Sequence, residues 1–541
     1  MRGLLASSIG VTCAAALALP LAPPAFAAAA AASPAVAAPV PAAPLGEAAA
    51  ARARVAAPDS PRTPPTVPSV PSVPGVRTVP DAPAVPAVPD ASAVPDVAGS
   101  TRSLPLVPLV RDRAVGGATA EQGLPRRTVA GFSLLGVVWD DPHAELRGRV
   151  QVRTRAAGTD TWSDWRELEP DGADHGADPD SPEAASGRVR GGTAPLWVGP
   201  SDGVEVRVRP EAADRSAPGT RSQAVQPGLP EGLRLDLVNP GTAPSVPAAG
   251  RHLPVTGTAH GRLAGLSPLR SAGTLDVPDE ASTVVTPAVL SAQSAAASAA
   301  NADLAPIGAT DIPALDRSRT VSELLSLRGA ELTEAQRAKP YIGPRPRIVT
   351  RRGWGADEKL RERKFVYTKK VKAAFVHHTV TGNTYKCSQA PSLIRGMYRY
   401  HVKSMGWRDI GYNFLVDKCG NIYEGRAGGV SKPVMGAHTL GFNTNSTGIA
   451  VIGTFGSSKP PAAAVKAVAK LTAWKLGLYG ANPKGRTYLT SGGGNLYRKG
   501  KKVRLHVISG HRDGFATECP GRQLYGKLGS ARSTAARLQG R

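Results

Sequence analysis

Two adjacent histidines, His377 and His378, stand near the end of the apolar run "KAAFVHHT" in a chain of 541 residues that contains 10 histidines. Further along, His511 precedes Cys519 by eight residues in "SGHRDGFATECPG", and the glycines there allow the connecting loop to fold back. Imidazole and thiolate groups are common zinc ligands, and three protein ligands with one open position are typical of a catalytic zinc site. The spacing therefore predicts a zinc site made by His511, Cys519 and one of the two paired histidines.

Each of these residues also has another interpretation. A single histidine at a strand end is more often a hydrogen-bonded core group than a metal ligand. The sequence has no HExxH segment, which excludes a thermolysin-like zinc site. A cysteine protease with Cys519 as its nucleophile is the rival enzyme, but Pro520 and Gly521 follow directly, so the thiol does not start an obvious helix that would activate it.

The cysteine count also bears on the zinc hypothesis. Residues 1–27 combine an early arginine, an apolar stretch and small residues near the end, which predicts a secretory signal peptide. Cys13 would leave with this peptide, so Cys387, Cys419 and Cys519 would remain in an oxidising compartment. An odd number of cysteines there means that one thiol is free or is held by another group, such as a metal.

The charge of the chain is concentrated in its C-terminal part. The net charge is +24, and residues 345–541 contain 36 basic and 8 acidic residues. A basic secreted protein attracts anionic surfaces, and in a cell envelope these are wall polymers. Export argues against nucleic acid as a partner, and no later segment reaches the length of a transmembrane helix, so we expect a soluble secreted protein.

Composition divides the chain into segments that could position these residues. Residues 28–125 are rich in Ala, Pro and Val, with the repeat "VPSVPSVPGV", which predicts an extended linker. Residues 129–240 alternate short β-type runs with turn signals and predict an accessory antiparallel β-sandwich. Residues 241–340 return to Ala, Pro and Ser and predict a second linker with a short helix near "SELLSL" and "LTEAQRA". The candidate site lies in the remaining domain, residues 344–541.

Four tryptophans fall within the predicted sandwich. Tryptophan on a β-sheet surface could stack on sugar rings, which would make this domain a wall-binding module. Tryptophan also packs between strands in cores, and we favour this interpretation. The four residues are Trp139, Trp162, Trp165 and Trp197.

The domain 344–541 alternates strand and helix patterns. "KAAFVHHT" and "STGIAVIGTF" read as buried strands, and "YNFLVDKCGNIYEGR" reads as a hairpin that turns at "CGN". "SLIRGMYRYHVK" and "PAAAVKAVAKLTAWKLGLYG" have apolar residues at helical spacing. These elements predict an α/β domain around a central sheet, with the paired histidines at a strand end.

Five segments in order make this domain recognisable: "RGWGAD", "FVHHT", "YHVKSMGWRDIGYNFLVDKCGNIYEGRAGG", "GAHTLGFNTNSTGIAVIGTF" and "GHRDGFATECPG". The domain resembles the peptidoglycan recognition protein family, that is, the zinc-dependent N-acetylmuramoyl-L-alanine amidases of type 2. The resemblance implies a central mixed β-sheet flanked by helices, and hydrolysis of the amide between the lactyl group of N-acetylmuramic acid and L-alanine. It also implies peptidoglycan as partner and a monomer at the cell wall, and the composition resembles that of actinobacterial chains.

The resemblance assigns roles to particular residues. It makes His377, His511 and Cys519 the ligands of one Zn²⁺ ion, which chooses between the paired histidines. Tyr412 matches the tyrosine beside the metal in active members, and we expect its hydroxyl to stabilise the oxyanion. Thr517 falls at a catalytic position, where it would orient water or substrate. The sequence does not identify the general base.

A further set of residues matches positions around the substrate groove of the family. Ordinary packing is a comparable explanation for each of them. They are His378, His401, Trp407, Arg426, His438 and Asn443. Some family members bind peptidoglycan without cleaving it and lack the zinc cysteine, so a non-catalytic binding protein is the alternative function.

Two features depart from the family pattern. Animal members place a disulfide just after the HHT motif within a short loop, whereas Cys387 has no near partner here. With Cys519 assigned to zinc by the resemblance, we predict a disulfide between Cys387 and Cys419. The second departure is "KGRTYLTSGGGNLYRKGKKVRLHVIS", a long basic segment that we expect to form a surface loop or hairpin near anionic wall polymer.

Overall fold

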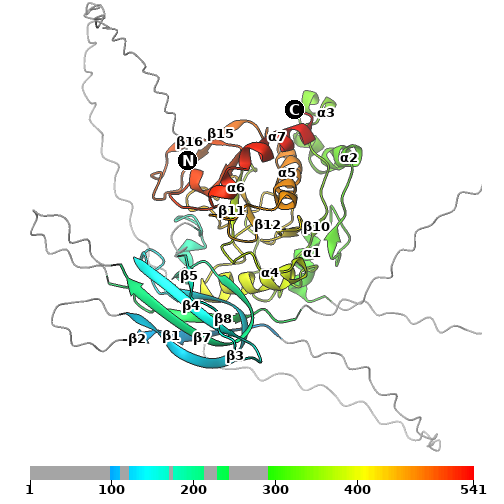
Figure 1. Ribbon diagram of the computed structural model, residues 1–541. Helices are drawn as coiled ribbons and strands as arrows, with labels where there is room; N and C mark the ends of the chain where they lie inside the picture. Colours follow the sequence, from blue (N-terminus) through cyan, green and yellow to red (C-terminus); the bar gives the residue numbers. More distant parts are fainter. Residues whose placement is uncertain (1–97, 110–120, 170–174, 212–227, 243–289) are drawn as a thin grey trace, which may run out of the picture. The chain divides into compact units, whose positions relative to one another are not determined.

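Figure 1 shows the computed structural model, which describes residues 98–109, 121–169, 175–211, 228–242 and 290–541. These residues belong to one compact unit, residues 90–541. The predicted signal peptide 1–27, most of the predicted linker 28–125 and residues 243–289 lie outside the described residues. The described chain forms an antiparallel sheet, a mixed sheet and a two-stranded hairpin.

The antiparallel sheet contains eight strands in the order β1-β8-β3-β7-β4-β5, with β2 and β6 also paired to β3. Strand β3 pairs with β7 along much of its length and with β8 in its second half, and its register shifts near Thr128 and Phe132. Such bulges bend a strand and let one sheet curl. The strands are β1 (Ser100–Pro105), β2 (Val107–Pro108), β3 (Gln122–Trp139), β4 (Gly148–Ala156), β5 (Arg166–Leu168), β6 (Gly191–Gly192), β7 (Leu196–Pro210) and β8 (Arg234–Asn239).

The interior of this domain is a single apolar cluster. Leu104 in β1 and Leu168 in β5 stand at opposite ends of the strand order, yet both belong to this cluster with Val150 and Val206. The two ends of the sheet therefore pack face to face, with alternate residues of each strand pointing inward. This arrangement confirms the predicted antiparallel β-sandwich.

The four tryptophans of the sandwich divide into two pairs. Trp139 and Trp197 are buried, as the packing interpretation expects. Trp162 and Trp165 are half-buried, and arginines stack on their rings, with the Cζ atom of Arg207 at 4.1 Å from the ring centroid of Trp165. These guanidinium groups contact ring surface that a sugar would need, which favours packing over sugar binding.

The start of the sandwich differs from the predicted boundary at residue 129. Strand β1 pairs along its whole length with β8, and β3 begins at Gln122, so the predicted linker 28–125 extends too far toward the C-terminus. Strand β1 stands first in the strand order and is an edge strand. Edge strands tolerate proline because one side of their backbone needs no ladder hydrogen bonds. The proline-rich composition therefore led to the prediction of a linker where this strand lies.

The second sheet is mixed and contains seven strands in the order β17-β11-β14-β12-β13-β10-β9. Neighbours are parallel from β17 to β12, antiparallel between β12 and β13, parallel between β13 and β10, and antiparallel at β9. This sheet and its helices confirm the predicted α/β domain. The strands are β9 (Asp311–Ile312), β10 (Ile348–Val349), β11 (Ala373–His378), β12 (Phe414–Val416), β13 (Ile422–Glu424), β14 (Ser446–Val451) and β17 (Ile508–Gly510).

Helices cover both faces of the mixed sheet (Figure 1). On one face, Ile449 of β14 packs in a cluster with residues of α5 (Ala462–Gly477) and α7 (Leu528–Gln539). On the other face, Ala450 packs with residues of α4 (Ala390–Arg399), which a π-helix, η4 (Tyr400–Ser404), continues. Successive strand residues point to opposite faces, so each strand of this sheet contributes to both clusters. The shorter helices are η1 (Ala184–Ser186), η3 (Cys387–Gln389), η5 (His511–Asp513) and α6 (Arg522–Tyr525).

The sandwich and the mixed-sheet domain share a buried core. Leu134 of β3 and Val238 of β8 belong to the same apolar cluster as Leu393 and Met397 of α4. The Tyr400 hydroxyl also donates a hydrogen bond to the Thr193 carbonyl, at 3.0 Å. Because apolar burial is the main favourable term in folding, this shared cluster stabilises the contact between the two domains.

The second predicted linker, 241–340, is wrong from residue 290 onward. Strand β9 extends the mixed sheet, and Leu304 and Leu324 are buried in its main cluster. Helix α2 begins after Asp316, whose carboxylate accepts a hydrogen bond from the Arg319 N–H at 2.8 Å. The short helix expected near "SELLSL" and "LTEAQRA" is present as α2 and α3. The helices are α1 (Ala292–Ala299), α2 (Arg317–Arg328), η2 (Gly329–Glu331) and α3 (Glu334–Ala338).

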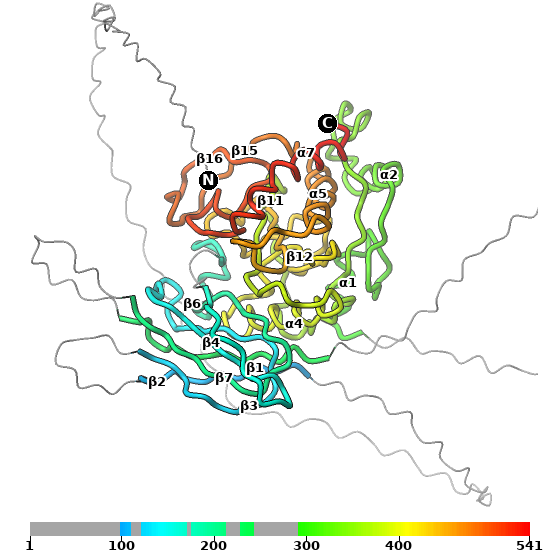
Figure 2. The backbone as a smooth tube through the Cα atoms, viewed as in Figure 1, coloured from blue at the N-terminus to red at the C-terminus, as the bar shows by residue number. Residues whose placement is uncertain are grey.

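Two smaller predictions are confirmed. Cys387 and Cys419 form a disulfide that joins the segment before α4 to the turn between β12 and β13. The basic segment forms the hairpin β15 (Arg486–Thr490) and β16 (Lys502–His506), whose backbone Figure 2 shows. Apolar side chains of this hairpin pack in one cluster with those of β11. Among the described residues, no helix has both the length and the apolar character needed to cross a membrane.

Candidate metal centre and groove

The register of the parallel strands brings the first two candidate ligands together. Every residue of β11 is buried, and β11 lies between β14 and β17. Val376 pairs with Gly510, the last residue of β17. His377 follows Val376, and His511 follows Gly510. The two histidines therefore lie side by side, and their ring centroids are 4.6 Å apart.

The two adjacent histidines face opposite sides of the sheet. His377 lies on the face of the candidate site, where its ring centroid is 5.4 Å from that of Tyr412. His378 points to the other face, where its Nδ1 accepts a hydrogen bond from the Phe455 N–H at 3.2 Å. The structure thus brings His377 into the cluster and leaves His378 outside it, because side chains alternate along a strand.

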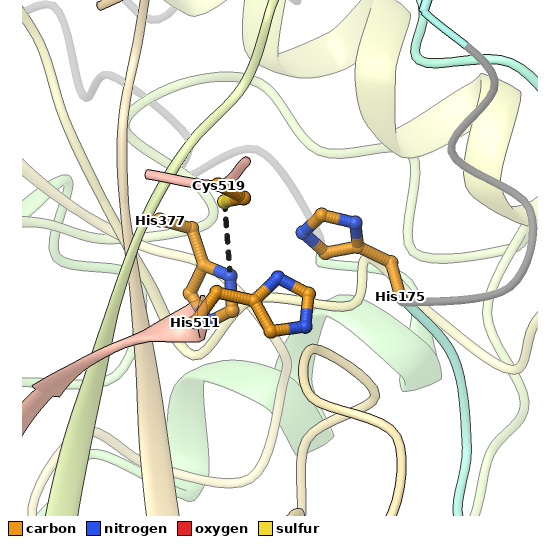
Figure 3. Close-up of side chains that lie close together, drawn as sticks. All are labelled: His175, His377, His511 and Cys519. Carbon is orange, nitrogen blue, oxygen red and sulfur yellow. Dashed lines mark hydrogen bonds between the residues drawn. The ribbon is translucent and has the colours of Figure 1, made fainter. Parts of the chain in front are cut away.

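The loop after β17 returns Cys519 to the end of β11. The Arg512 N–H donates to the Cys519 carbonyl at 3.0 Å, which closes the loop. The Asp513 carboxylate accepts from the Gly510 N–H at 2.9 Å and from the Tyr525 hydroxyl at 2.6 Å. The Cys519 sulfur then lies 3.7 Å from His377 Nδ1, as the dashed line in Figure 3 marks.

A fourth residue, His175 from the sandwich domain, completes the cluster. The ligand atoms of His175, His377, His511 and Cys519 all lie within 4.8 Å of one another, and all four residues are buried. Figure 3 shows their side chains converging. Zinc binds imidazole and thiolate groups at about 2.0–2.3 Å, so donors of these types at this spacing fit a tetrahedral zinc ion. His175 was not among the residues predicted from the sequence, although a histidine within "GADHGADP" was a signal in a chain with few histidines.

The surroundings keep the His377 ring neutral and oriented. Burial, with a smaller contribution from His511, moves the pKa of His377 well below its ordinary value. A metal binds the neutral form of imidazole. His377 Nε2 lies 3.4 Å from the Thr439 hydroxyl, which itself lies 3.0 Å from His438 Nδ1. Thr439, which was also not predicted from the sequence, therefore orients the ring from outside the cluster.

The two residues predicted to act in catalysis lie at this cluster in different ways. Tyr412 is buried just before β12, with its ring centroid 5.7 Å from that of His175. Thr517 is half-buried, and its hydroxyl accepts a hydrogen bond from the Cys519 N–H at 3.1 Å. Tyr412 thus borders the space around the candidate ligands, whereas Thr517 holds the backbone of one ligand.

Asn443, predicted to line the groove, connects two segments. Its Oδ1 accepts from the N–H groups of His438 and Thr439, at 2.7 and 3.1 Å, and so fixes the loop beside His377. Its Nδ2 donates to the Gly176 carbonyl and to the Asp178 carboxylate, each at 2.8 Å. The amide therefore contacts the segment that carries His175.

Arg426, also predicted to line the groove, forms a bidentate ion pair with Glu183. Its Nη1 and Nη2 atoms lie 2.8 and 3.0 Å from the two carboxylate oxygens, and both residues are buried. Burial alone would raise the pKa of Glu183, but the pair with Arg426 more than offsets this effect, and the pKa is lowered. Glu183 is therefore ionised at neutral pH.

His438, another groove candidate, lies beside the cluster, with its ring centroid 5.2 Å from that of His377. Two further groove candidates, His401 and Trp407, pack against each other. The ring centroids of His401 and Trp407 are 4.5 Å apart, and the Gly411 N–H donates to His401 Nδ1 at 3.2 Å. Burial, followed in size by the proximity of His175, lowers the pKa of His401 to about 3. The structure places this neutral pair beside Tyr412, with ring centroids of His401 and Tyr412 at 5.9 Å.

Two segments of the chain match known protein families. Residues 367–522 match the family described as N-acetylmuramoyl-L-alanine amidase, and residues 86–228 match the family described as Rv3811 N-terminal galactose-binding domain-like. The first match contains all three predicted metal ligands and Tyr412. The second match covers most of the sandwich.

Individual relatives agree with the first match. Peptidoglycan-recognition protein SC1a of Drosophila melanogaster is 32% identical over 155 residues, which are 29% of this chain and 70% of that protein. The N-acetylmuramoyl-L-alanine amidase of Homo sapiens is 32% identical over 201 residues, 37% of this chain and 29% of that protein. Among solved structures, wild-type Drosophila PGRP-LB is 26% identical, with a TM-score of 0.27, over 34% of this chain and 92% of that one. Since the chain is 32% identical to peptidoglycan-recognition protein SC1a over 70% of that protein, it belongs to the peptidoglycan recognition protein and N-acetylmuramoyl-L-alanine amidase family.

Proposed function

We propose that this protein is a secreted zinc-dependent N-acetylmuramoyl-L-alanine amidase. It cleaves the amide between the lactyl group of N-acetylmuramic acid and L-alanine in peptidoglycan. The observation that carries the proposal is the buried cluster of His377, His511 and Cys519 inside the part of the chain that matches the amidase family. The human relative named as such an amidase supports the same reaction.

The three cluster residues of this domain would hold the zinc ion. Two neutral imidazoles and one thiolate leave a net charge of about +1 on the centre. When bound, zinc supplies Lewis acidity, which polarises the amide carbonyl and lowers the pKa of a water ligand. Thr439 and Thr517 keep His377 and Cys519 in position through the contacts described above.

Tyr412 has the position needed to assist the reaction directly. Its ring borders the cluster, and it is buried, so a hydrogen bond from its hydroxyl acts in a medium of low dielectric constant. We assign this hydroxyl to the carbonyl oxygen that gains negative charge as the amide is attacked. Thr517 is too weak a base to accept the proton, so its role is to position Cys519.

The groove would bind the glycan and the stem peptide. Arg426 and Asn443 offer hydrogen-bond donors for carboxylate and carbonyl groups, and His401, Trp407 and His438 form the neighbouring wall. We omit His378, because its side chain lies on the other face of the sheet. Solved structures of two relatives, PGRP-LE and a mutant of Drosophila PGRP-LB, are complexes with tracheal cytotoxin, described for PGRP-LE as a monomeric diaminopimelic acid-type peptidoglycan.

Location and partners follow from the proposed substrate. Residues 1–27 would direct export, and the protein would act as a monomer at the cell wall. The excess of basic residues in 345–541 favours attraction to anionic wall polymers.

The proposal is tested by mass spectrometry of purified peptidoglycan after incubation with the zinc-loaded protein, with and without a chelator. We expect stem peptides with a new N-terminal alanine, and their release should stop with the chelator and in the His511→Ala variant. Retention on intact peptidoglycan without any new N-terminus, by the wild type and by the His175→Ala variant alike, would instead support the alternative, a non-catalytic binding protein.

A further inference from the structure

The segment 175–183 of the sandwich domain, which we call the covering segment, contacts the candidate site along its length. Its first residue, His175, is 6% exposed, and its ring centroid is 4.5 Å from that of His511 and 5.2 Å from that of His377. In Figure 3 the His175 ring points toward the same space as the other three side chains. The histidine reaches this space from a different domain, so the contact depends on tertiary packing.

Asp178 attaches the middle of the covering segment to the groove. Its Oδ1 accepts from the Gly441 N–H at 2.9 Å, from the Asn443 N–H at 3.3 Å and from Asn443 Nδ2 at 2.8 Å. Its Oδ2 lies 3.4 Å from the Thr444 hydroxyl. A carboxylate with this many donors is held firmly, and it uses the Asn443 amide that we assigned to substrate.

Glu183 attaches the other end of the covering segment. Besides its bidentate pair with Arg426, its Oε1 accepts from the Arg408 N–H at 2.9 Å. Glu183 is 4% exposed, so a substrate could not reach these donors without displacing the carboxylate. Two carboxylates of the chain thus contact two of the residues that we assigned to the substrate groove.

These contacts bear on the number of ligands at the metal. A zinc site with three protein ligands keeps one position for water or substrate, whereas a site with four protein ligands is closed and typical of structural zinc. His175 would raise the number of ligands at this centre from three to four. Four protein ligands at the metal and a covered groove would each block the reaction for as long as the covering segment stays in place.

We propose that His175 is the fourth zinc ligand and that the covering segment fills the substrate groove, which makes the folded chain a latent amidase. The inference rests on the proposed function, since latency is defined by the activity that it blocks. Activity then requires the covering segment to leave the groove, which opens a coordination position and uncovers Arg426 and Asn443. Peptidoglycan competes with the carboxylates of the segment for the same donors.

Zinc K-edge X-ray absorption of the full-length zinc-loaded protein tests the coordination without any assay of activity. We expect one sulfur and three imidazole ligands in the wild type, and one sulfur, two imidazoles and one light non-imidazole ligand in His175→Ala. His143→Ala, which removes a more accessible histidine of the same domain, is the matched control and should leave the spectrum unchanged. If the wild type and His175→Ala give the same number of imidazole ligands, the proposal is wrong.

Release of stem peptides by the same proteins tests the latency. We expect the His175→Ala rate to exceed that of the wild type and of His143→Ala by about tenfold or more, because the competent fraction rises. Loss of the third imidazole ligand without any rise in rate would overturn the latency. If neither protein releases peptide although the coordination differs, the proposed function fails and the assignment of His175 as a ligand stands. His175→Asn, a smaller polar substitution, replaces His175→Ala if that variant does not fold.

Discussion

The candidate metal centre has two parts that are held in different ways. His377 and His511 extend from parallel strands whose residues are buried in the mixed-sheet domain, so sheet register and apolar packing set their positions. His175 belongs to the covering segment, whose main contacts are the polar ones of Asp178 and Glu183. The three candidate ligands of the mixed-sheet domain are therefore held permanently, whereas the fourth candidate is attached by groups that water or a substrate can replace.

Energetics support this distinction. Moving the β11 residues out of the core would expose apolar surface, at about 25 cal/mol per Å². A buried ion pair such as Glu183 with Arg426 adds little net stability, because desolvation offsets most of the attraction. If both partners of the pair regain water or new partners, the covering segment can leave at a modest cost.

The largest effect should come from removing a permanent ligand. Cys519→Ala should lose the zinc ion and lower the rate of peptide release by more than about 100-fold. Replacing a residue that only hydrogen-bonds to a metal ligand typically lowers metal affinity or activity by about 10–100-fold, and loss of a ligand itself should cost more. Metal analysis after dialysis and the peptidoglycan assay measure both. If the variant keeps a full equivalent of zinc, Cys519 is not one of the permanent zinc ligands.

Tyr412→Phe should separate catalysis from metal binding. We expect kcat to fall by about 10²–10³-fold, as for the loss of one donor to a developing oxyanion. Zinc content should remain at that of the wild type, because the hydroxyl is not a ligand. An unchanged kcat would remove Tyr412 from the mechanism and leave it a packing role.

The disulfide should affect the permanent part alone. Cys387→Ser combined with Cys419→Ser should lower the free energy of unfolding by about 2–4 kcal/mol, the usual range for a native disulfide. Thermal or urea unfolding of the zinc-loaded protein measures this change. The number of imidazole ligands at zinc should not change, and a loss of His175 coordination would show that the two parts are coupled.

The smallest effect should come from loosening the covering segment without touching its histidine. Glu183→Gln weakens the pair with Arg426 and should raise the rate of peptide release by about tenfold or less, in the same direction as His175→Ala. Asp180→Asn is the matched control, since its ion pair with Lys499 is about two-thirds exposed and should contribute under about 1 kcal/mol. Equal rates for Glu183→Gln, Asp180→Asn and the wild type would contradict the role of Glu183.

Much of the fold could be predicted because its signals are local. The apolar run in "KAAFVHHT" identified β11, helical spacing identified α4 and α5, and the turn at "CGN" identified the hairpin of β12 and β13. Composition failed at the edges of the linkers, where β1 is an edge strand that carries proline and α1 is a helix that consists mostly of Ala and Ser. Both elements depend on packing against the rest of the chain, which composition does not report.

By itself the sequence determined the types of the candidate ligands, their order and the strand end on which His377 stands, because residue chemistry and strand periodicity are local properties. Periodicity left the choice between His377 and His378 open, and the family resemblance alone favoured His377. The tertiary structure places His377 at the cluster and His378 on the other face, since the direction of the alternation depends on which face packs on α5 and α7. Only the tertiary structure brought in His175 as well. Its approach depends on the core that β3 and β8 share with α4, and such contacts between distant segments leave no periodic signal in the sequence.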